Sequence, residues 1–259
     1  MTGVVATDNA DEKTAWVTGA GKGIGCELVR CLTAEGWTVA ASARTREDLE
    51  SLAGECEPGR VHAFPLDVTD AKSTETTIDR IEDMLGPLHL VVLNAGTHIP
   101  MTAATFSLPG FRTLVETNLI GTVNGLAPVM ERFLRRKSGH IALVSSMTGY
   151  RGLPTASAYG ATKAALINLA EALRPELEAG GVRLTLINPG FVKTPLTDRN
   201  EFAMPFLMPV EDAVQEIMRG LKKNAFEIRF PWRLAVVMGI MRILPYRLFF
   251  ALTRRMVGK

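Results

Sequence analysis

Short apolar runs alternate with segments of helical periodicity along most of the chain, and no other feature restricts the fold as strongly. The run at residues 88–93 is almost wholly apolar, as a strand buried on both faces requires. Strands that alternate with helices form a parallel, doubly wound sheet, and ligands bind outside the carboxyl ends of its strands. We therefore predict an α/β fold with helices on both faces and about seven strands, at residues 14–18, 38–43, 61–66, 88–93, 140–144, 182–187 and 226–230.

The length and composition favour one domain. The chain has 259 residues, 47% hydrophobic and 22% charged, which suffices for one large core, and no linker or internal repeat divides it. We predict a domain over residues 13–230, a basic amphipathic helical extension over 231–259, and a loose N-terminal arm over 1–12. The arm lacks the apolar region of a secretory signal, so a cytoplasmic location is expected.

The cysteines and histidines give no sign of a metal site. The three cysteines are odd in number and lack metal-ligand spacing, which favours reduced thiols in a cytosolic protein. The four histidines are scattered without carboxylate or cysteine partners. No metal is expected.

A glycine-rich turn follows the first predicted strand. Gly19, Gly21, Gly23 and Gly25 precede a helical segment, so the order is strand, glycine turn, helix. Glycines let the backbone approach a pyrophosphate, and free N–H groups at a helix N-terminus favour its negative charge. The spacing is G-x-x-x-G-x-G, and a merely tight connection is the alternative. Phosphate binding, with Lys22 and Ile24 in the same turn, is the preferred interpretation.

The next two strand ends bear on the choice of cofactor. The second strand ends in Arg44, where an NAD site would carry an acid, and Lys22 can reach the same place. Two cations favour a 2′-phosphate, although both could be ordinary surface residues. Asp67 and Val68 follow the third strand, where they could meet an adenine edge. A turn-capping role for Asp67 is nearly as good an explanation.

Tyr159 and Lys163 begin another helical segment. The apolar residues of its stripe are Ala161, Ala164, Ala165, Leu166, Leu169, Ala170 and Leu173. Residues four apart share a helix face, so the phenol and the ammonium can point to one spot. A nearby ammonium lowers a phenol's pKa, which makes it a useful acid or base. Alone, such a pair is more often structural.

These residues together resemble the short-chain dehydrogenase/reductase family over most of residues 13–200. The shared motifs occur in the family's order: Thr18-Gly19 with Gly23-Ile24-Gly25, Asp67, Asn94-Ala95-Gly96, Asn118, Ser146, Tyr159 with Lys163, Pro189-Gly190, and Thr194. Family spacing, thirteen residues before the tyrosine, selects Ser146 over Ser145. Leu93 departs from the Asn that many members have there, which predicts a small change in cofactor packing. The resemblance implies a single-domain Rossmann-like fold.

The resemblance also implies a mechanism. Tyr159 would exchange a proton with the substrate oxygen, Ser146 would bind that oxygen, and Lys163 would lower the tyrosine pKa and hold the nicotinamide ribose. Asn118 would support a proton-passing water. The implied cofactor-binding residues are Thr18, Gly19, Gly21, Lys22, Gly23, Ile24, Arg44, Asp67, Val68, Asn94, Ala95, Gly96, Tyr159, Lys163, Pro189, Gly190, Val192 and Thr194. Ala43 followed by Arg44 matches the family's NADP(H)-preferring pattern.

The predicted function is NADP(H)-dependent interconversion of a carbonyl and an alcohol, with reduction the expected direction. A cofactor-binding regulatory or scaffold protein is the alternative, but that class usually has a damaged catalytic set. Family members suggest a homodimer or homotetramer. The region 191–222 would cover the substrate, and its apolar residues Phe202, Met204, Phe206, Leu207 and Met208 favour a hydrophobic substrate, unless they serve core packing.

Charge is concentrated at the C-terminus. Residues 219–259 hold ten Lys/Arg and one acid, a net charge of +9. Residues 1–218 hold nineteen Lys/Arg and twenty-six Asp/Glu, a net charge of −7. Residues 232–256 mix arginines with apolar runs too short to span a bilayer. Packing against the domain or a second subunit is the preferred explanation, and peripheral contact with an anionic membrane is the alternative. Nucleic-acid binding is disfavoured, because the aromatics lie within apolar runs.

Overall fold

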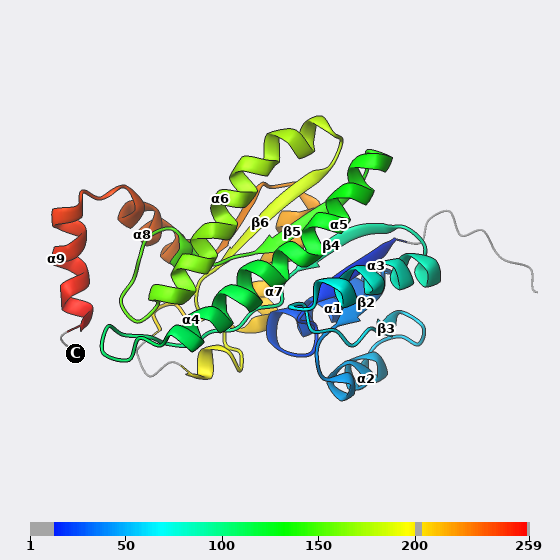
Figure 1. Ribbon diagram of the computed structural model, residues 1–259, viewed down its shortest axis with the longest axis horizontal. Coiled ribbons are helices and arrows are strands. Elements are labelled where there is room, and N and C mark those ends of the chain that lie inside the picture. Colours follow the sequence, from blue (N-terminus) through cyan, green and yellow to red (C-terminus); the bar gives the residue numbers. More distant parts are fainter. Residues whose placement is uncertain (1–12, 200–203, 258–259) are drawn as a thin grey trace, which may run out of the picture.

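A single parallel sheet runs through the molecule (Figure 1). The computed structural model describes residues 13–199 and 204–257, and within these ranges the sheet has seven strands. The strands are β1 (Thr14–Thr18), β2 (Thr38–Ser42), β3 (Val61–Ala63), β4 (Leu88–Leu93), β5 (His140–Val144), β6 (Arg183–Pro189) and β7 (Glu227–Phe230). Their order is β3-β2-β1-β4-β5-β6-β7, and all pairs are parallel. The predicted Rossmann-like fold is confirmed, and its switch point lies between β1 and β4.

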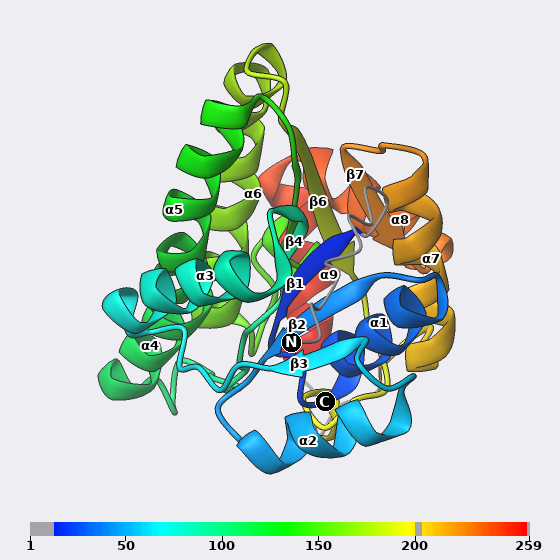
Figure 2. The same ribbon diagram turned by 90° about the vertical axis from the view of Figure 1, so that its right-hand side faces the viewer.

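Helices cover both faces of the sheet (Figure 2). They are α1 (Gly23–Ala34), α2 (Arg46–Glu55), α3 (Ala71–Leu85), α4 (Leu108–Val115), α5 (Gly121–Arg136), α6 (Ser157–Ala179), α7 (Val210–Lys222), α8 (Trp232–Ile243) and α9 (Tyr246–Val257). Side chains alternate across β1, so Ala15 and Val17 pack with α1 and α7 while Trp16 packs with α3 and α5. The two resulting cores fix the sheet between its layers.

The segment around Asn118 is not a regular α-helix. A π-helical turn, Glu116–Ile120, joins α4 to α5. Single π-turns inside helices are rare and are often found at functional sites. This turn carries Asn118 into the interior, where it is fully buried.

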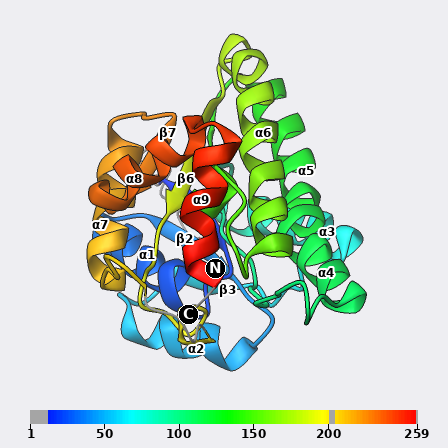
Figure 3. The same ribbon diagram turned by 90° about the vertical axis from the view of Figure 1, so that its left-hand side faces the viewer.

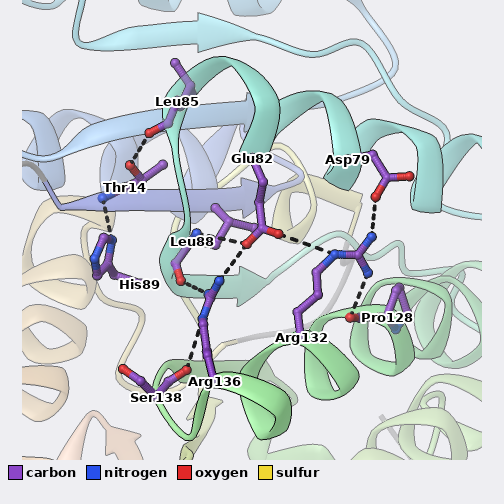
Figure 4. A network of polar contacts seen from close by, with 10 residues as sticks. All are labelled: Thr14, Asp79, Glu82, Leu85, Leu88, His89, Pro128, Arg132, Arg136 and Ser138. Atoms are coloured by element: carbon purple, nitrogen blue, oxygen red, sulfur yellow. Dashed lines mark hydrogen bonds and ion pairs between the residues drawn. The ribbon is translucent and has the colours of Figure 1, made fainter. Parts of the chain in front are cut away.

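A polar network fastens α3 to α5 and to the start of β4 (Figure 4). Glu82 Oε1 accepts hydrogen bonds from Arg136 Nη1 at 2.8 Å and from the Leu88 backbone N–H at 3.1 Å. Glu82 Oε2 lies 3.4 Å from Arg132 Nε, and Arg132 also pairs with Asp79. With 21% of its side chain exposed, Glu82 on α3 is the acceptor shared by donors from α5 and β4.

α8 and α9 lie at one end of the molecule, beyond β7 (Figures 1 and 3). The inner face of α8 packs on Met147 and Tyr150. In the described ranges, no helix combines the length and apolarity needed to cross a bilayer. The predicted arm, residues 1–12, lies outside the described residues, and the division into arm, domain and extension stays a prediction.

Replacing Glu82 by Ala should lower the free energy of unfolding by about 2 kcal/mol, because it leaves two guanidinium groups and a backbone N–H without their shared acceptor. Urea unfolding measures this change. Glu178→Ala is the control, since Glu178 is 70% exposed and forms a surface ion pair with Arg174 at 3.6 Å. That substitution should cost less than about 0.5 kcal/mol. Equal losses in the two variants would contradict a stabilising role for the network.

Candidate active site

The glycine turn between β1 and α1 is packed too closely to admit side chains. Gly19 has φ +66°, and a Cβ there would lie 2.8 Å from Ala95 Cα. A Cβ on Gly25 would lie 2.3 Å from the Gly19 carbonyl oxygen. Contacts this short cannot be relieved by rotating a side chain, so both positions require glycine.

The ends of β1 and β4 are joined by side chains as well as by the sheet. Thr18 Oγ1 accepts hydrogen bonds from the backbone N–H groups of Asn94 (3.0 Å) and Ala95 (3.1 Å). Asn94 Nδ2 donates to the carbonyl oxygens of Thr18 (2.9 Å) and Gly19 (3.2 Å). The Asn94-Ala95-Gly96 segment thus holds the glycine turn in place through hydrogen bonds. This structural role is additional to the cofactor contact predicted for the segment.

The N-terminus of α1 has the features of a phosphate site. Its N-cap residue, Lys22, makes no side-chain cap, whereas Asp70 and Ser107 cap α3 and α4. The first N–H groups of α1 therefore have no capping side chain, and such groups favour a negative charge. Thr194 lies over the turn, with its Cγ2 3.0 Å from where a Cβ on Gly23 would lie. A pyrophosphate fits this arrangement.

The two cations predicted to bind a 2′-phosphate differ in their surroundings. Arg44 is exposed directly after β2. Lys22 Nζ lies 3.3 Å from Asp48 Oδ2, so it already has an acidic partner. Asp48, in the first turn of α2, also lies within 3.4 Å of a Cβ placed on Gly21. Sequence reasoning found no acid at the end of β2 and missed this one, which comes from the following helix.

Asp67 caps a turn in the structure. Its Oδ1 accepts from the Thr69 backbone N–H at 3.0 Å and from Thr69 Oγ1 at 2.8 Å. The Val68 carbonyl oxygen accepts from Asn124 Nδ2 at 2.9 Å. The turn-capping alternative is therefore observed, and the adenine contact predicted for Asp67 and Val68 stays a prediction.

Three polar side chains converge where β5 ends and α6 begins. Lys163 Nζ donates to the Val144 carbonyl oxygen at 2.9 Å and lies 5.7 Å from the centre of the Tyr159 ring. Ser146 hydrogen-bonds the Tyr159 phenol, and its Oγ lies 2.7 Å from Thr148 Oγ1. Ser145 Oγ instead donates to the Lys163 carbonyl oxygen at 2.8 Å. The geometry thus gives Ser146 the position facing the phenol and Ser145 a role in holding α6.

Burial dominates the pKa values of this group. Burial lowers the pKa of Lys163 from 10.5 to about 8. Burial also raises the pKa of Tyr159 to about 12, against which the Ser146 hydrogen bond acts weakly. Burial disfavours the phenolate and outweighs any lowering of the Tyr159 pKa by Lys163, whose amine is hydrogen-bonded to Val144; that lowering stays a prediction.

Asn118 connects the loop after β4 to α6. Its Oδ1 accepts from the Thr97 backbone N–H at 2.7 Å. Its Nδ2 donates to the Thr97 carbonyl oxygen at 3.0 Å and to Thr162 Oγ1 at 3.2 Å. A Cβ on Gly96 would lie 3.3 Å from Asn118 Oδ1 and 3.6 Å from Lys163 Nζ. Asn118 is therefore neither solvent-facing nor bonded to its own helix, the usual fates of a mid-helix Asn.

An open cleft brings half of the predicted residues together. It is lined by Ile24, Asn94, Gly96, Thr97, Val144, Ser145, Ser146, Tyr159, Lys163, Pro189, Gly190, Val192, Thr194, Leu196 and Thr197. The predicted residues that do not line it are Thr18, Gly19, Gly21, Lys22, Gly23, Arg44, Asp67, Val68, Ala95 and Asn118. Among the described residues no group of His, Cys, Asp and Glu could hold a metal ion.

Sequence reasoning missed His98, which it treated as one of the scattered histidines. The His98 ring meets the Tyr159 ring edge-on at 4.7 Å and is 9% exposed. Its position two residues after Gly96 was the only available signal.

Two small hydrophobic clusters pack next to the catalytic residues, and the apolar residues named here do not line the cleft. Beside Ser146 lie Met147, Phe191 and Met238. Beside Tyr159 lie Ile99 and Met101. In the predicted lid, Phe206 and Leu207 are each 43% exposed, while Met208 packs on the core. Phe202 lies outside the described residues.

Comparison with known proteins identifies the family. Residues 13–203 match the family model described as short chain dehydrogenase, so the chain belongs to the short-chain dehydrogenase family of oxidoreductases. It is 40% identical over 246 residues to an uncharacterized oxidoreductase of Myxococcus xanthus, and the match covers 94% of this chain and 97% of that protein. The resemblance predicted from the motifs is confirmed.

Solved structures share the fold. A short-chain dehydrogenase from Streptomyces avermitilis matches with a TM-score of 0.83 at 24% identity, covering 95% of this chain and 98% of that one. A variant of actinorhodin polyketide ketoreductase, solved with NADPH, matches with a TM-score of 0.76 at 25% identity, covering 85% and 95%.

Proposed function

We propose that this protein reduces a ketone or aldehyde on a hydrophobic molecule to the alcohol, with NADPH as the hydride donor. The convergence of Ser146, Tyr159 and Lys163 in the cleft carries this proposal. An intact catalytic set of this kind argues against a regulatory or scaffold protein on the same fold.

Each of the three side chains has a defined task in the proposed reaction. NADPH, when bound, supplies the hydride that adds to the carbonyl carbon. Tyr159 donates its proton to the carbonyl oxygen, and its pKa of about 12 keeps it protonated at neutral pH. Ser146 donates a hydrogen bond to the same oxygen and stabilises the charge developing there. Lys163 holds the nicotinamide ribose, and Asn118 supports proton transfer to solvent.

Arg44 is the main support for NADP(H) over NAD(H). It is exposed after β2, while Lys22 shares its charge with Asp48. A guanidinium suits a phosphate through charge-assisted hydrogen bonds. The NADPH in the matched ketoreductase agrees with this preference. The fit of the pyrophosphate to the N-terminus of α1 applies to either nucleotide.

The apolar residues in and near the cleft support a hydrophobic substrate. Ile24, Val192 and Leu196 line the cleft. Phe206 and Leu207 of the region 191–222 are each 43% exposed and are available to cover an apolar body. We further propose that the protein works as a homodimer or homotetramer.

Replacing Tyr159 by Phe should reduce turnover at least about 100-fold, because it removes the proton donor. NADPH oxidation, first screened over hydrophobic ketones and aldehydes with the wild-type protein, measures it. Tyr246→Phe is the control, since Tyr246 is 68% exposed on α9, and it should match the wild type. NADPH should still bind to Tyr159→Phe. Full activity of that variant, or no oxidation of NADPH with any carbonyl compound, would refute the proposal.

Replacing Arg44 by Ala should weaken NADPH binding about 10-fold or more, because a charged hydrogen bond to the 2′-phosphate is lost. Binding of NADH, which lacks that phosphate, should change little. Fluorescence titration with both nucleotides measures the difference. Arg46→Ala is the matched control, since Arg46 is a nearby exposed arginine that pairs with Glu50 at 3.6 Å. Equal losses for NADPH and NADH in Arg44→Ala would remove the role given to Arg44.

A further inference from the structure

The helix α8 carries an apolar stripe on the side facing solvent, beside the exposed Arg233 and Arg242, as well as an apolar side facing the protein. Leu234, Ala235 and Met238 pack inward. The outward stripe is Trp232 (69% exposed), Val236 (53%), Ile240 (53%) and Ile243 (80%). These positions are three or four apart and therefore share one face. An apolar stripe on the solvent side of a helix normally marks contact with another protein surface or with a membrane.

The next helix adds positive charge to this apolar surface. Phe249 and Thr253 of α9 are buried, while Arg247, Arg254 and Arg255 are exposed and, among the described residues, have no acidic partner. The segment 231–259 holds six Lys/Arg and no Asp or Glu. The two helices, residues 232–257, are called the C-terminal hairpin below.

We propose that the C-terminal hairpin binds the surface of an anionic lipid bilayer. The outward stripe of α8 would enter the boundary between headgroups and acyl chains, and the arginines of α9 would contact the anionic headgroups. Trp232 and Tyr246 are 69% and 68% exposed. Tryptophan and tyrosine are the residues that membrane proteins concentrate at this boundary.

The charge distribution favours a lipid surface over a second copy of the chain. A two-fold interface brings the same patch of both subunits together. Pairing two C-terminal hairpins in this way would place arginines near arginines with no acid in the segment to compensate them. An anionic bilayer offers opposite charge over the whole surface.

The C-terminal hairpin can dock without leaving the rest of the protein. Arg151 Nη1 donates to the Arg242 carbonyl oxygen at 3.0 Å, and Arg151 Nη2 donates to the Leu244 carbonyl oxygen at 3.2 Å. The same guanidinium lies 4.5 Å from the Phe249 ring centre. These contacts tie the turn between α8 and α9 to the loop that follows Ser146, so a docked hairpin would place the cleft next to the lipid.

Sedimentation of the full chain with vesicles tests the proposal. The protein should pellet with vesicles that mix phosphatidylcholine and phosphatidylglycerol, should not pellet with phosphatidylcholine alone, and should be released by high salt. Ile240→Glu with Ile243→Glu should abolish binding. Arg254→Glu with Arg255→Glu should weaken it at least about 25-fold, since each cation near an anionic surface contributes about 5-fold.

Matched variants away from the C-terminal hairpin control for charge and for exposed apolar residues. Met84 and Leu134 are 61% and 40% exposed on α3 and α5, and Met84→Glu with Leu134→Glu should bind as the wild type does. Arg135→Glu with Lys223→Glu reverses two exposed cations and should also bind normally. Circular dichroism verifies that each variant is folded.

Three results would overturn the proposal. They are no binding of the wild type to anionic vesicles, equal binding to vesicles with and without phosphatidylglycerol, and unchanged binding by folded variants of the C-terminal hairpin. If the wild type fails to bind lipid and Ile240→Glu with Ile243→Glu converts an oligomer to a smaller species by light scattering, a second copy covers the surface instead.

Discussion

A buried ammonium group at the end of β5 is the constraint on which the site depends. Lys163 Nζ is held by the Val144 carbonyl oxygen at 2.9 Å, and the whole residue is 4% exposed. Its pKa falls from 10.5 to about 8, which corresponds to about 3 kcal/mol against the charged form. Burying a charged group in this way opposes folding. Such a cost is typical of functional sites, where chemistry requires the perturbed group.

The rest of the site is arranged around this group by the backbone of the sheet. Ser145 anchors the start of α6 through the Lys163 carbonyl oxygen. Gly96, after β4, leaves the space beside Lys163 Nζ open. Asn118 joins that loop to α6 from the π-helical turn. Neighbouring parallel strands end at the same edge, so separate stretches of sequence meet at one cation.

Much of this arrangement could be predicted from the sequence. The apolar runs predicted all seven strands. The order of the motifs predicted the catalytic residues that the cleft brings together. The third strand is shorter than predicted, Val61–Ala63, because only β2 borders it, although Phe64 and Leu66 still donate to Ala41 and Ala43 carbonyl oxygens. The ends of strands are the positions at which a prediction from sequence differs most often from the observed hydrogen-bonded pairing.

What could not be predicted depends on contacts between distant segments. The π-turn at Asn118 has no sequence signature, and the partner of Lys22 is a residue of the next helix. The ring contact of His98 with Tyr159 requires the loop after β4 to fold over α6. The direction of the Tyr159 pKa was predicted from its neighbour Lys163, but burial of the phenol determines it.

The pH dependence of kcat/KM for carbonyl reduction tests the buried ammonium most directly. Lys163 is protonated below its pKa of about 8 and loses its proton as the pH rises through that value, while Tyr159, with a pKa of about 12, keeps its own. We therefore expect a plateau below about pH 8 and a decline above it. A profile that stays flat up to the ordinary lysine pKa of 10.5 would contradict this account.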